Sequence, residues 1–177
     1  MSSSDDFASI TTRVVRLLQE RRERVVFAES CTAGWVAALL SAEPGISAHL
    51  CGSLVTYRES CKQAWLGVEE LVLREHTAVS APVTRQMALG ALARTDEAHW
   101  AVAVTGHVGP QAPPELDGVC FVALARRAEV PTPAASPPQI VASRVQLTTV
   151  GRVERQQEAA RWVLERLGEA LAAARLA

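Results

Sequence analysis

The fold is decided in residues 24–40, which read RVVFAESCTAGWVAALL. The apolar run within Arg24–Glu29 is typical of a short strand buried on both faces. The small residues Ser30–Gly34 then predict a turn, and the apolar segment Trp35–Leu40 predicts a helix. This succession of a strand, a turn and the beginning of a helix indicates an α/β fold, with the turn at the carboxyl end of a parallel strand.

The alternation of helices and strands continues on both sides of this stretch. Ahead of it, Asp5 and Asp6 can cap an amphipathic helix that ends in the charged run Gln19–Arg24. After it, the pattern predicts strands at 50–57, 99–104, 118–125 and 139–147, and helices at 59–66, 81–94 and 152–175. Only the proline-rich loop Pro131–Pro138 separates the last two strands, so we expect them to be antiparallel neighbours.

These elements predict a single domain over residues 1–177. Helices between successive strands favour a three-layer α/β/α sandwich. Its sheet is expected to be mixed and mainly parallel, with a C-terminal antiparallel hairpin. Ligands of such open sheets bind beyond the carboxyl ends of parallel strands, where the turns at Ser30 and Thr105 are predicted.

Composition excludes several other classes of protein. The chain has 177 residues, of which 49% are hydrophobic and 21% charged, enough for one core without disulfide or metal staples. The formal net charge of -1 gives no electrostatic reason to expect general nucleic-acid binding. The N-terminal MSSSDD lacks the basic start of a secretory signal, and no apolar run reaches the roughly 18 residues of a membrane span. We therefore expect a cytoplasmic protein without a membrane partner.

The cysteines and histidines have no metal-binding or redox spacing. The four cysteines, which we expect to be reduced and mostly buried, are Cys31, Cys51, Cys61 and Cys120. They contain no C-x-x-C pair, and the four histidines contain no H-x-x-x-H spacing, so the sequence predicts neither a metal nor a cofactor. His107 is the histidine of most interest, because it lies in a loop directly after a predicted strand.

The turn Ser30–Gly34 combines hydroxyls, a thiol and backbone N–H groups at a helix N-terminus. Such a terminus favours an anion, although a Ser or Thr there is most often only a helix cap. Cys31 is a candidate nucleophile because a helix N-terminus lowers a thiol pKa, and a buried structural cysteine is the commoner alternative.

A second group consists of Ser47, Tyr57 and Lys62. A lysine whose pKa is lowered by desolvation can take the proton of a serine hydroxyl, and a tyrosine can relay or stabilise that proton. Each residue also has a purely structural interpretation, as a cap, a half-buried strand residue and a solvated helix residue respectively.

Two further segments are suited to ligand binding. Thr105–Pro110 is a polar loop with glycines after a buried strand, but it matches neither G-x-G-x-x-G nor a phosphate-binding P-loop. Arg152 and Arg155 open the last predicted helix, either as a solvated pair or as a phosphate site.

Taken in order, these segments resemble the C-terminal domain of the CinA family, the nicotinamide-nucleotide amidohydrolase (PncC-type) proteins, over about residues 9–170. The resemblance is carried by short blocks whose order is kept throughout. They are Ala28–Gly34, Pro44–Ala48, Gly52–Tyr57 with Lys62, Leu66–Val68, His76–Ser80, Ala101–Gly106 with Gly109-Pro110, and Gly118-Val119.

The resemblance implies an α/β/α fold and metal-free hydrolysis of the carboxamide of nicotinamide mononucleotide to nicotinic acid mononucleotide and ammonia. It implies Ser47 as the nucleophile, Lys62 as its general base and Tyr57 as an assisting residue. The implied substrate-binding residues are Ser30, Thr32, Thr105 and Gly106 around the nucleotide and Arg152 at the phosphate. It also implies a homo-oligomer.

The chain departs from the family pattern mainly around the substrate. The family's Gly-Ile-Ala-Gly-Pro is Gly106–Pro110 here, with His107 in place of the isoleucine, and the following segment 111–118 has lost most glycines and a lysine. The family's Thr-Gly-Gly contains Ala33, and Glu59 replaces an asparagine. A second hypothesis is therefore a non-catalytic nucleotide-binding or regulatory protein. A third is a cysteine hydrolase that uses Cys31 with His49 or His107.

Overall fold

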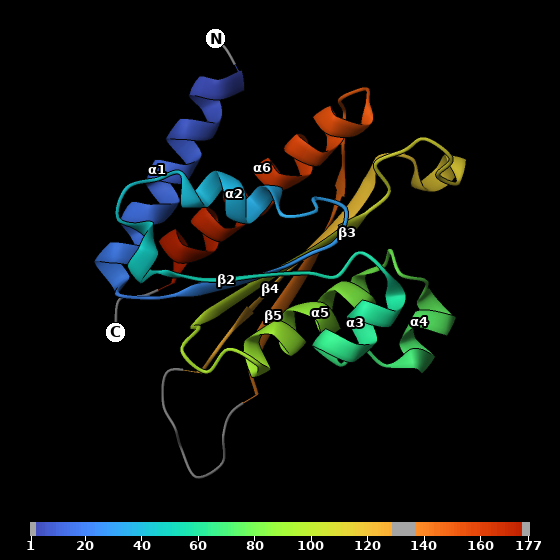
Figure 1. The fold of residues 1–177 in the computed structure, drawn as a ribbon, viewed down its shortest axis with the longest axis horizontal. Helices are drawn as coiled ribbons and strands as arrows, with labels where there is room; N and C mark the ends of the chain where they lie inside the picture. The colour runs from blue at the N-terminus through green and yellow to red at the C-terminus, as the bar shows by residue number, and fades with distance from the viewer. Residues whose placement is uncertain (1–2, 129–136, 175–177) are drawn as a thin grey trace.

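A single sheet lies between two layers of helices in the computed structural model, which describes residues 3–128 and 137–174 (Figure 1). The strands are β1 (Val25–Glu29), β2 (Leu50–Val55), β3 (Trp100–Gly106), β4 (Val119–Arg126) and β5 (Gln139–Gln146). The α-helices are α1 (Ser3–Arg21), α2 (Trp35–Ser41), α3 (Glu59–Leu66), α4 (Glu70–His76), α5 (Ala81–Ala93) and α6 (Arg152–Ala173). Two short 3-10 helices are η1 (Ile46–Ala48) and η2 (Pro114–Leu116).

The strand order is β2-β1-β3-β4-β5. The strands β2, β1 and β3 are parallel, while β4 runs antiparallel to β3 and β5 antiparallel to β4. The predicted α/β fold with a mixed sheet and a C-terminal antiparallel hairpin is therefore confirmed. Residues 131–136 of the predicted proline-rich loop lie outside the described residues.

The two faces of the sheet bury different side chains. One face packs large residues such as Phe27 and Val102 against α1, α2 and α6. The other face, covered by α3, α4 and α5, presents mostly small residues, namely Ala28, Ala101, Ala103, Ala123 and Ala125. The alanines let α5 lie close to the sheet. The same helix also lies close to α3: a Cβ at Gly90 would lie only 1.9 Å from the carbonyl oxygen of Leu66. Close packing of small residues accounts for the low aromatic content of the chain.

The helix α4 was not predicted. It has only seven residues, and Leu73 is its single buried one, so the sequence carries almost no helical periodicity there. The helix ends at His76, because the next residue, Thr77, has a φ of 63° that is incompatible with its continuation. The other predicted elements are present with ends that differ by a few residues.

All four cysteines are free thiols, with Cys31 and Cys120 buried and Cys51 and Cys61 half-buried. Within the described ranges, no helix combines the length and the apolar character that crossing a membrane requires.

Candidate functional site

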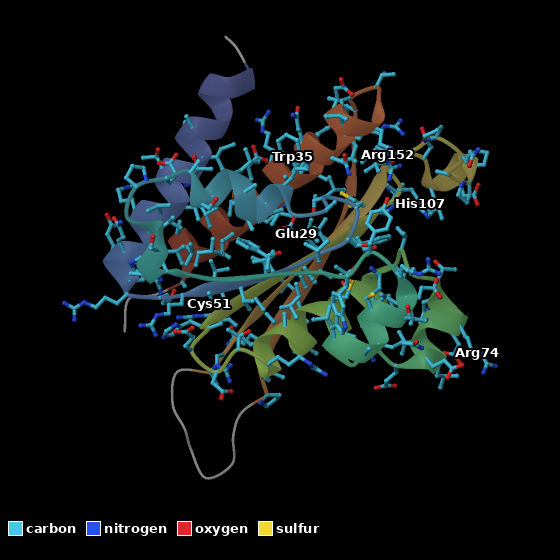
Figure 2. All side chains as sticks on the ribbon, viewed as in Figure 1. Glu29, Trp35, Cys51, Arg74, His107 and Arg152 are labelled. Atoms are coloured by element: carbon cyan, nitrogen blue, oxygen red, sulfur yellow. The ribbon has the colours of Figure 1, made fainter. Side chains whose placement is uncertain are left out.

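A cavity of about 240 Å³ opens where the parallel strands end. Ser30 follows β1, Tyr57 follows β2, and Thr105 lies at the end of β3. Because β2 and β3 lie on opposite sides of β1, the strand order reverses at this point, which is where open α/β sheets bind ligands. The loop after β3 and Arg152 at the start of α6 complete the wall, and Figure 2 shows His107 and Arg152 at this same end of the sheet.

Lys62 lies at the floor of the cavity. It is 1% exposed, and its Nζ lies 2.8 Å from Ser30 Oγ and 2.7 Å from the carbonyl oxygen of Thr56. Burial lowers the pKa of Lys62 from an ordinary 10.5 to about 8. A lysine of ordinary pKa is almost wholly protonated near neutral pH, whereas a pKa of about 8 leaves a usable fraction of this amine neutral, able to accept a proton from the Ser30 hydroxyl.

Ser47 does not join this group. It is an exposed residue of η1, directly before β2, whereas Tyr57 and Lys62 follow the other end of that strand. A strand rises about 3.3 Å per residue, so β2 places roughly 17–20 Å between these two ends. The predicted contact between Ser47 and Lys62 is thus corrected: Ser30, which was expected only to bind substrate, holds the position beside the lysine amine.

Thr32 also differs from its predicted position. Its side chain is fully buried, and its Oγ1 donates to Glu29 Oε2 at 2.8 Å instead of lining the cavity. The Glu29 carboxylate accepts three backbone N–H groups at the start of α2, those of Gly34, Val36 and Ala37. This helix terminus, which was expected to attract a ligand anion, is therefore already occupied by a carboxylate of the protein.

Thr105 and Gly106, which the resemblance implies as substrate-binding residues, both line the cavity. Thr105 is 1% exposed, and its Oγ1 donates to the carbonyl oxygen of Ala78 at 3.1 Å. At Gly106 a Cβ would lie 2.5 Å from Cys120 Cβ, so the close approach to β4 requires glycine. The backbone of His107 pairs with Val119 and fixes the start of the loop.

Arg152 joins the two sides of the cavity mouth. Its Nη2 donates to Tyr57 OH and its Nη1 to the carbonyl oxygen of Gly109. Arg155 is engaged elsewhere, because it forms a bidentate pair with Asp117 at 2.6 and 2.7 Å. Hydrogen bonds from Arg155 lower the pKa of Asp117. Of the two arginines considered from the sequence, only Arg152 faces the cavity.

Cys31 lines the cavity but has the properties of a structural thiol. Burial raises its pKa to about 12, the opposite of the lowering expected at a helix N-terminus. His107 shares the cavity, whereas His49 binds the carbonyl oxygen of Glu23 through Nδ1. The geometry therefore gives the cysteine hydrolase hypothesis little support.

The cavity is lined by basic side chains and not by carboxylates, within the described residues. Its basic residues are Lys62, His107 and Arg152, and no Asp or Glu is among the described residues that line it. An arrangement of this kind favours an anionic ligand. Elsewhere in the described ranges, no three His, Cys, Asp or Glu side chains gather as metal ligands do.

Three features of the site were not predicted. Ala78 and Val79, in the segment between α4 and α5, form part of the wall, and Glu29 organises the turn that carries Ser30. A signal for Glu29 does exist in the sequence: it is a carboxylate at the end of an apolar strand, and one short turn separates it from a helix start that lacks a capping side chain. Ala78 and Val79 lie in the block 76–80 that carries the resemblance, but nothing in that block indicates a role in the site.

Comparisons with known proteins agree with this architecture. The model of the CinA C-terminal domain matches residues 7–171. A CinA-like protein of Prochlorococcus marinus (strain MIT 9313) is 47% identical over 107 residues, which are 60% of this chain and 24% of that protein. One of Mycobacterium marinum is 43% identical over 124 residues, 68% of this chain and 28% of that protein. The chain thus matches only about a quarter of the length of these relatives.

Solved structures cover nearly the whole chain. The competence/damage inducible protein CihA from Agrobacterium tumefaciens superposes with a TM-score of 0.84 at 32% identity, covering 94% of this chain and 96% of that one. A CinA superfamily protein from Klebsiella pneumoniae 700603 gives 0.83 at 31% identity, covering 94% and 98%. On the family match and these superpositions, the chain belongs to the CinA C-terminal domain family.

Proposed function

We propose that this chain is a metal-independent amidohydrolase that converts nicotinamide mononucleotide to nicotinic acid mononucleotide and ammonia, with Ser30 as nucleophile and Lys62 as general base. The observation that carries the proposal is the 2.8 Å contact between the buried Lys62 amine and Ser30 Oγ. A serine becomes a nucleophile when a base within hydrogen-bond reach removes its proton.

The surroundings of Lys62 suit this role in both protonation states. A neutral amine has two hydrogens and one lone pair, so Nζ can donate to the Thr56 carbonyl oxygen while it accepts the Ser30 proton. A protonated amine donates to both oxygens. The proton can therefore move between Lys62 and Ser30 without a change in the position of either side chain.

In the first half-reaction, Ser30 Oγ attacks the carboxamide carbon and its proton passes to Lys62 Nζ. The C–N bond then breaks as Lys62 gives this proton to the departing nitrogen, which releases ammonia and leaves an ester on Ser30. The amide of Cys31 donates to no backbone carbonyl among the described residues and is a candidate donor to the oxyanion.

In the second half-reaction, water attacks the ester carbon and Lys62 takes one of the water protons. The bond to Ser30 Oγ breaks as Lys62 returns a proton to this oxygen, which releases the carboxylic acid. The lysine thus acts as base and acid in turn, and both residues return to their starting states.

The basic side chains support a nucleotide monophosphate as substrate. Arg152 and His107 line the cavity and are less buried than Lys62, so they can bind a phosphate while the carboxamide reaches Ser30. Tyr57, which accepts a hydrogen bond from Arg152, is proposed to orient that guanidinium. The choice of nicotinamide mononucleotide itself rests on the family resemblance.

The test is to incubate the purified protein with nicotinamide mononucleotide and to measure ammonia and the nucleotide product. We expect one ammonia for each nicotinic acid mononucleotide formed. Nicotinamide riboside, which lacks the phosphate, is the matched control, and we expect it to have a higher KM because Arg152 and His107 lose their ligand.

A thermal shift with nicotinamide mononucleotide separates turnover from binding. Stabilisation of the protein with complete recovery of the nucleotide would replace the amidohydrolase by a nucleotide-binding protein. If the protein shows no stabilisation and releases no ammonia, both functions are contradicted.

A further inference from the structure

The Glu29 carboxylate is the most heavily hydrogen-bonded side-chain group near the cavity. It is fully buried, at 0% exposure, and accepts hydrogen bonds at 2.8–3.1 Å. The donors are Thr32 Oγ1 and the backbone N–H groups of Gly34 and Val36 on Oε2, and Ser53 Oγ and the N–H of Ala37 on Oε1. These bonds join three segments: the turn after β1, the first turn of α2, and β2.

Ser30 follows Glu29 directly and begins the turn that this carboxylate holds. The turn has two successive residues with left-handed backbone, Ala33 with φ 51° and Gly34 with φ 102°. Left-handed φ is unfavourable for alanine, by about 1 kcal/mol, so other contacts must maintain this conformation. The bonds from Thr32 and Gly34 to Glu29, on either side of Ala33, are contacts of this kind.

The backbone of Ser30 is therefore fixed from both sides. Its N–H donates to the carbonyl oxygen of Val104 on β3 at 3.1 Å, and its own carbonyl accepts from Ala33 N–H at 3.1 Å. The first bond belongs to the sheet, whereas the second exists only while the turn keeps its shape. The hydrogen bonds of Glu29 to Thr32 and Gly34 hold that shape, and Glu29 is not itself among the residues that line the cavity.

We propose that Glu29 is a positioning residue for the reaction: its carboxylate fixes the turn so that Ser30 Oγ stays within hydrogen-bond distance of Lys62 Nζ. This inference rests on the proposed function. A correctly placed nucleophile matters strongly for rate, because a shift of about 1 Å can cost a hundredfold.

Two hydroxyl groups donate to the Glu29 carboxylate, and removing them one at a time separates an effect on the position of Ser30 from an effect on the stability of the fold. Thr32 lies in the turn that carries Ser30, and Ser53 lies on β2, outside that turn. The variants Thr32→Val and Ser53→Ala each remove one hydrogen bond to Glu29, and Thr32→Ser restores the hydroxyl. Direct substitution by Glu29→Gln is a poorer test, because an amide NH2 group would face N–H and O–H donors and threaten folding.

For each variant we would measure Tm, kcat and KM, and also the rate at which a fluorophosphonate probe labels Ser30, followed by intact mass. The expected result is a similar fall in Tm for Thr32→Val and Ser53→Ala. The kcat and labelling rate should fall at least fivefold further in Thr32→Val than in Ser53→Ala, with KM within twofold and recovery in Thr32→Ser.

Equal losses in the two variants, or no loss in Thr32→Val, would overturn the positioning role. Probe labelling distinguishes this failure from that of the proposed function. A wild type that reacts with the probe at Ser30 but releases no ammonia refutes the substrate assignment, and the variants still report on Glu29.

Discussion

The two ends of the sheet each contain a buried charged side chain, and the surroundings of the two differ. At the amino end, Glu23 is 8% exposed and accepts hydrogen bonds from Arg21, Trp100 and Arg126. At the carboxyl end, Lys62 is 1% exposed, and its Nζ forms hydrogen bonds with a hydroxyl and a carbonyl oxygen. No carboxylate within the described residues forms an ion pair with it.

This difference determines the protonation behaviour of the two groups. Burial alone would raise the pKa of Glu23, but hydrogen bonds from Arg21, Trp100 and Arg126 outweigh burial, and its pKa is lowered. Burial lowers the pKa of Lys62 to about 8, and nothing nearby reverses this. Removal of one partner from a buried, hydrogen-bonded charge destabilises the fold, whereas a buried amine without a counter-ion in a cavity is a candidate for chemistry.

The largest expected effect is that of Lys62→Met on activity. Removal of the base should lower kcat/KM for ammonia release by about 10³-fold or more. The Tm should stay the same or rise, because an apolar side chain replaces a buried amine without a counter-ion. Activity within tenfold of wild type, or a variant that fails to fold, would show that Lys62 belongs with Glu23 as a structural group.

The opposite outcome is expected for Glu23→Ala. Loss of a carboxylate that binds two arginines and Trp100 should lower the free energy of unfolding by about 3–5 kcal/mol, measured by urea denaturation. The kcat of the folded fraction should not change. Glu20→Ala is the matched control, since Glu20 pairs with Arg16 on the surface and its loss should cost at most about 0.5 kcal/mol.

The pH profile tests the protonation state of Lys62. The base must be neutral to accept the Ser30 proton, so kcat/KM should rise with pH up to the lysine pKa of about 8 and then level off. With this pKa, the value at pH 6 should be about fiftyfold below that at pH 8. A profile that is flat between pH 6 and 8 would rule out a lysine base of this pKa.

The smallest expected effect concerns the turn at the carboxyl end. Ala33 has a left-handed φ of 51°, so Ala33→Gly should stabilise the protein by about 1 kcal/mol in thermal or urea unfolding. Ala38→Gly is the control, because this exposed residue lies within α2, where glycine should destabilise by about 1 kcal/mol. A loss of stability in Ala33→Gly would show that the turn is not strained at this residue.

The elements around the site could be predicted because each carries a strong local pattern. The apolar strand at 25–29 and the small residues after it placed the turn of Ser30 correctly. The burial of Lys62 and its lowered pKa also follow the expectation for a lysine base. The segment 67–80 could not be predicted in the same way, since Leu73 alone marks the buried side of α4.

The partner of Lys62 was harder to predict, and the family resemblance implied the other serine, Ser47. Ser47 is closer to Lys62 in sequence than Ser30 is, but it precedes β2 while Lys62 follows it. Because β1 and β2 are parallel, the residue after β1 and those after β2 meet at one edge of the sheet. Sheet topology therefore decides the pairing, and residue types alone do not.

The most direct test of a Ser30–Lys62 pair compares two single substitutions. Ser30→Ala and Ser47→Ala remove the same hydroxyl group at opposite ends of β2, and ammonia release from nicotinamide mononucleotide is measured for both folded proteins. We expect Ser30→Ala to abolish the activity and Ser47→Ala to keep it within about threefold of wild type. An active Ser30→Ala protein beside an inactive Ser47→Ala protein would contradict the assignment of Ser30 as the nucleophile.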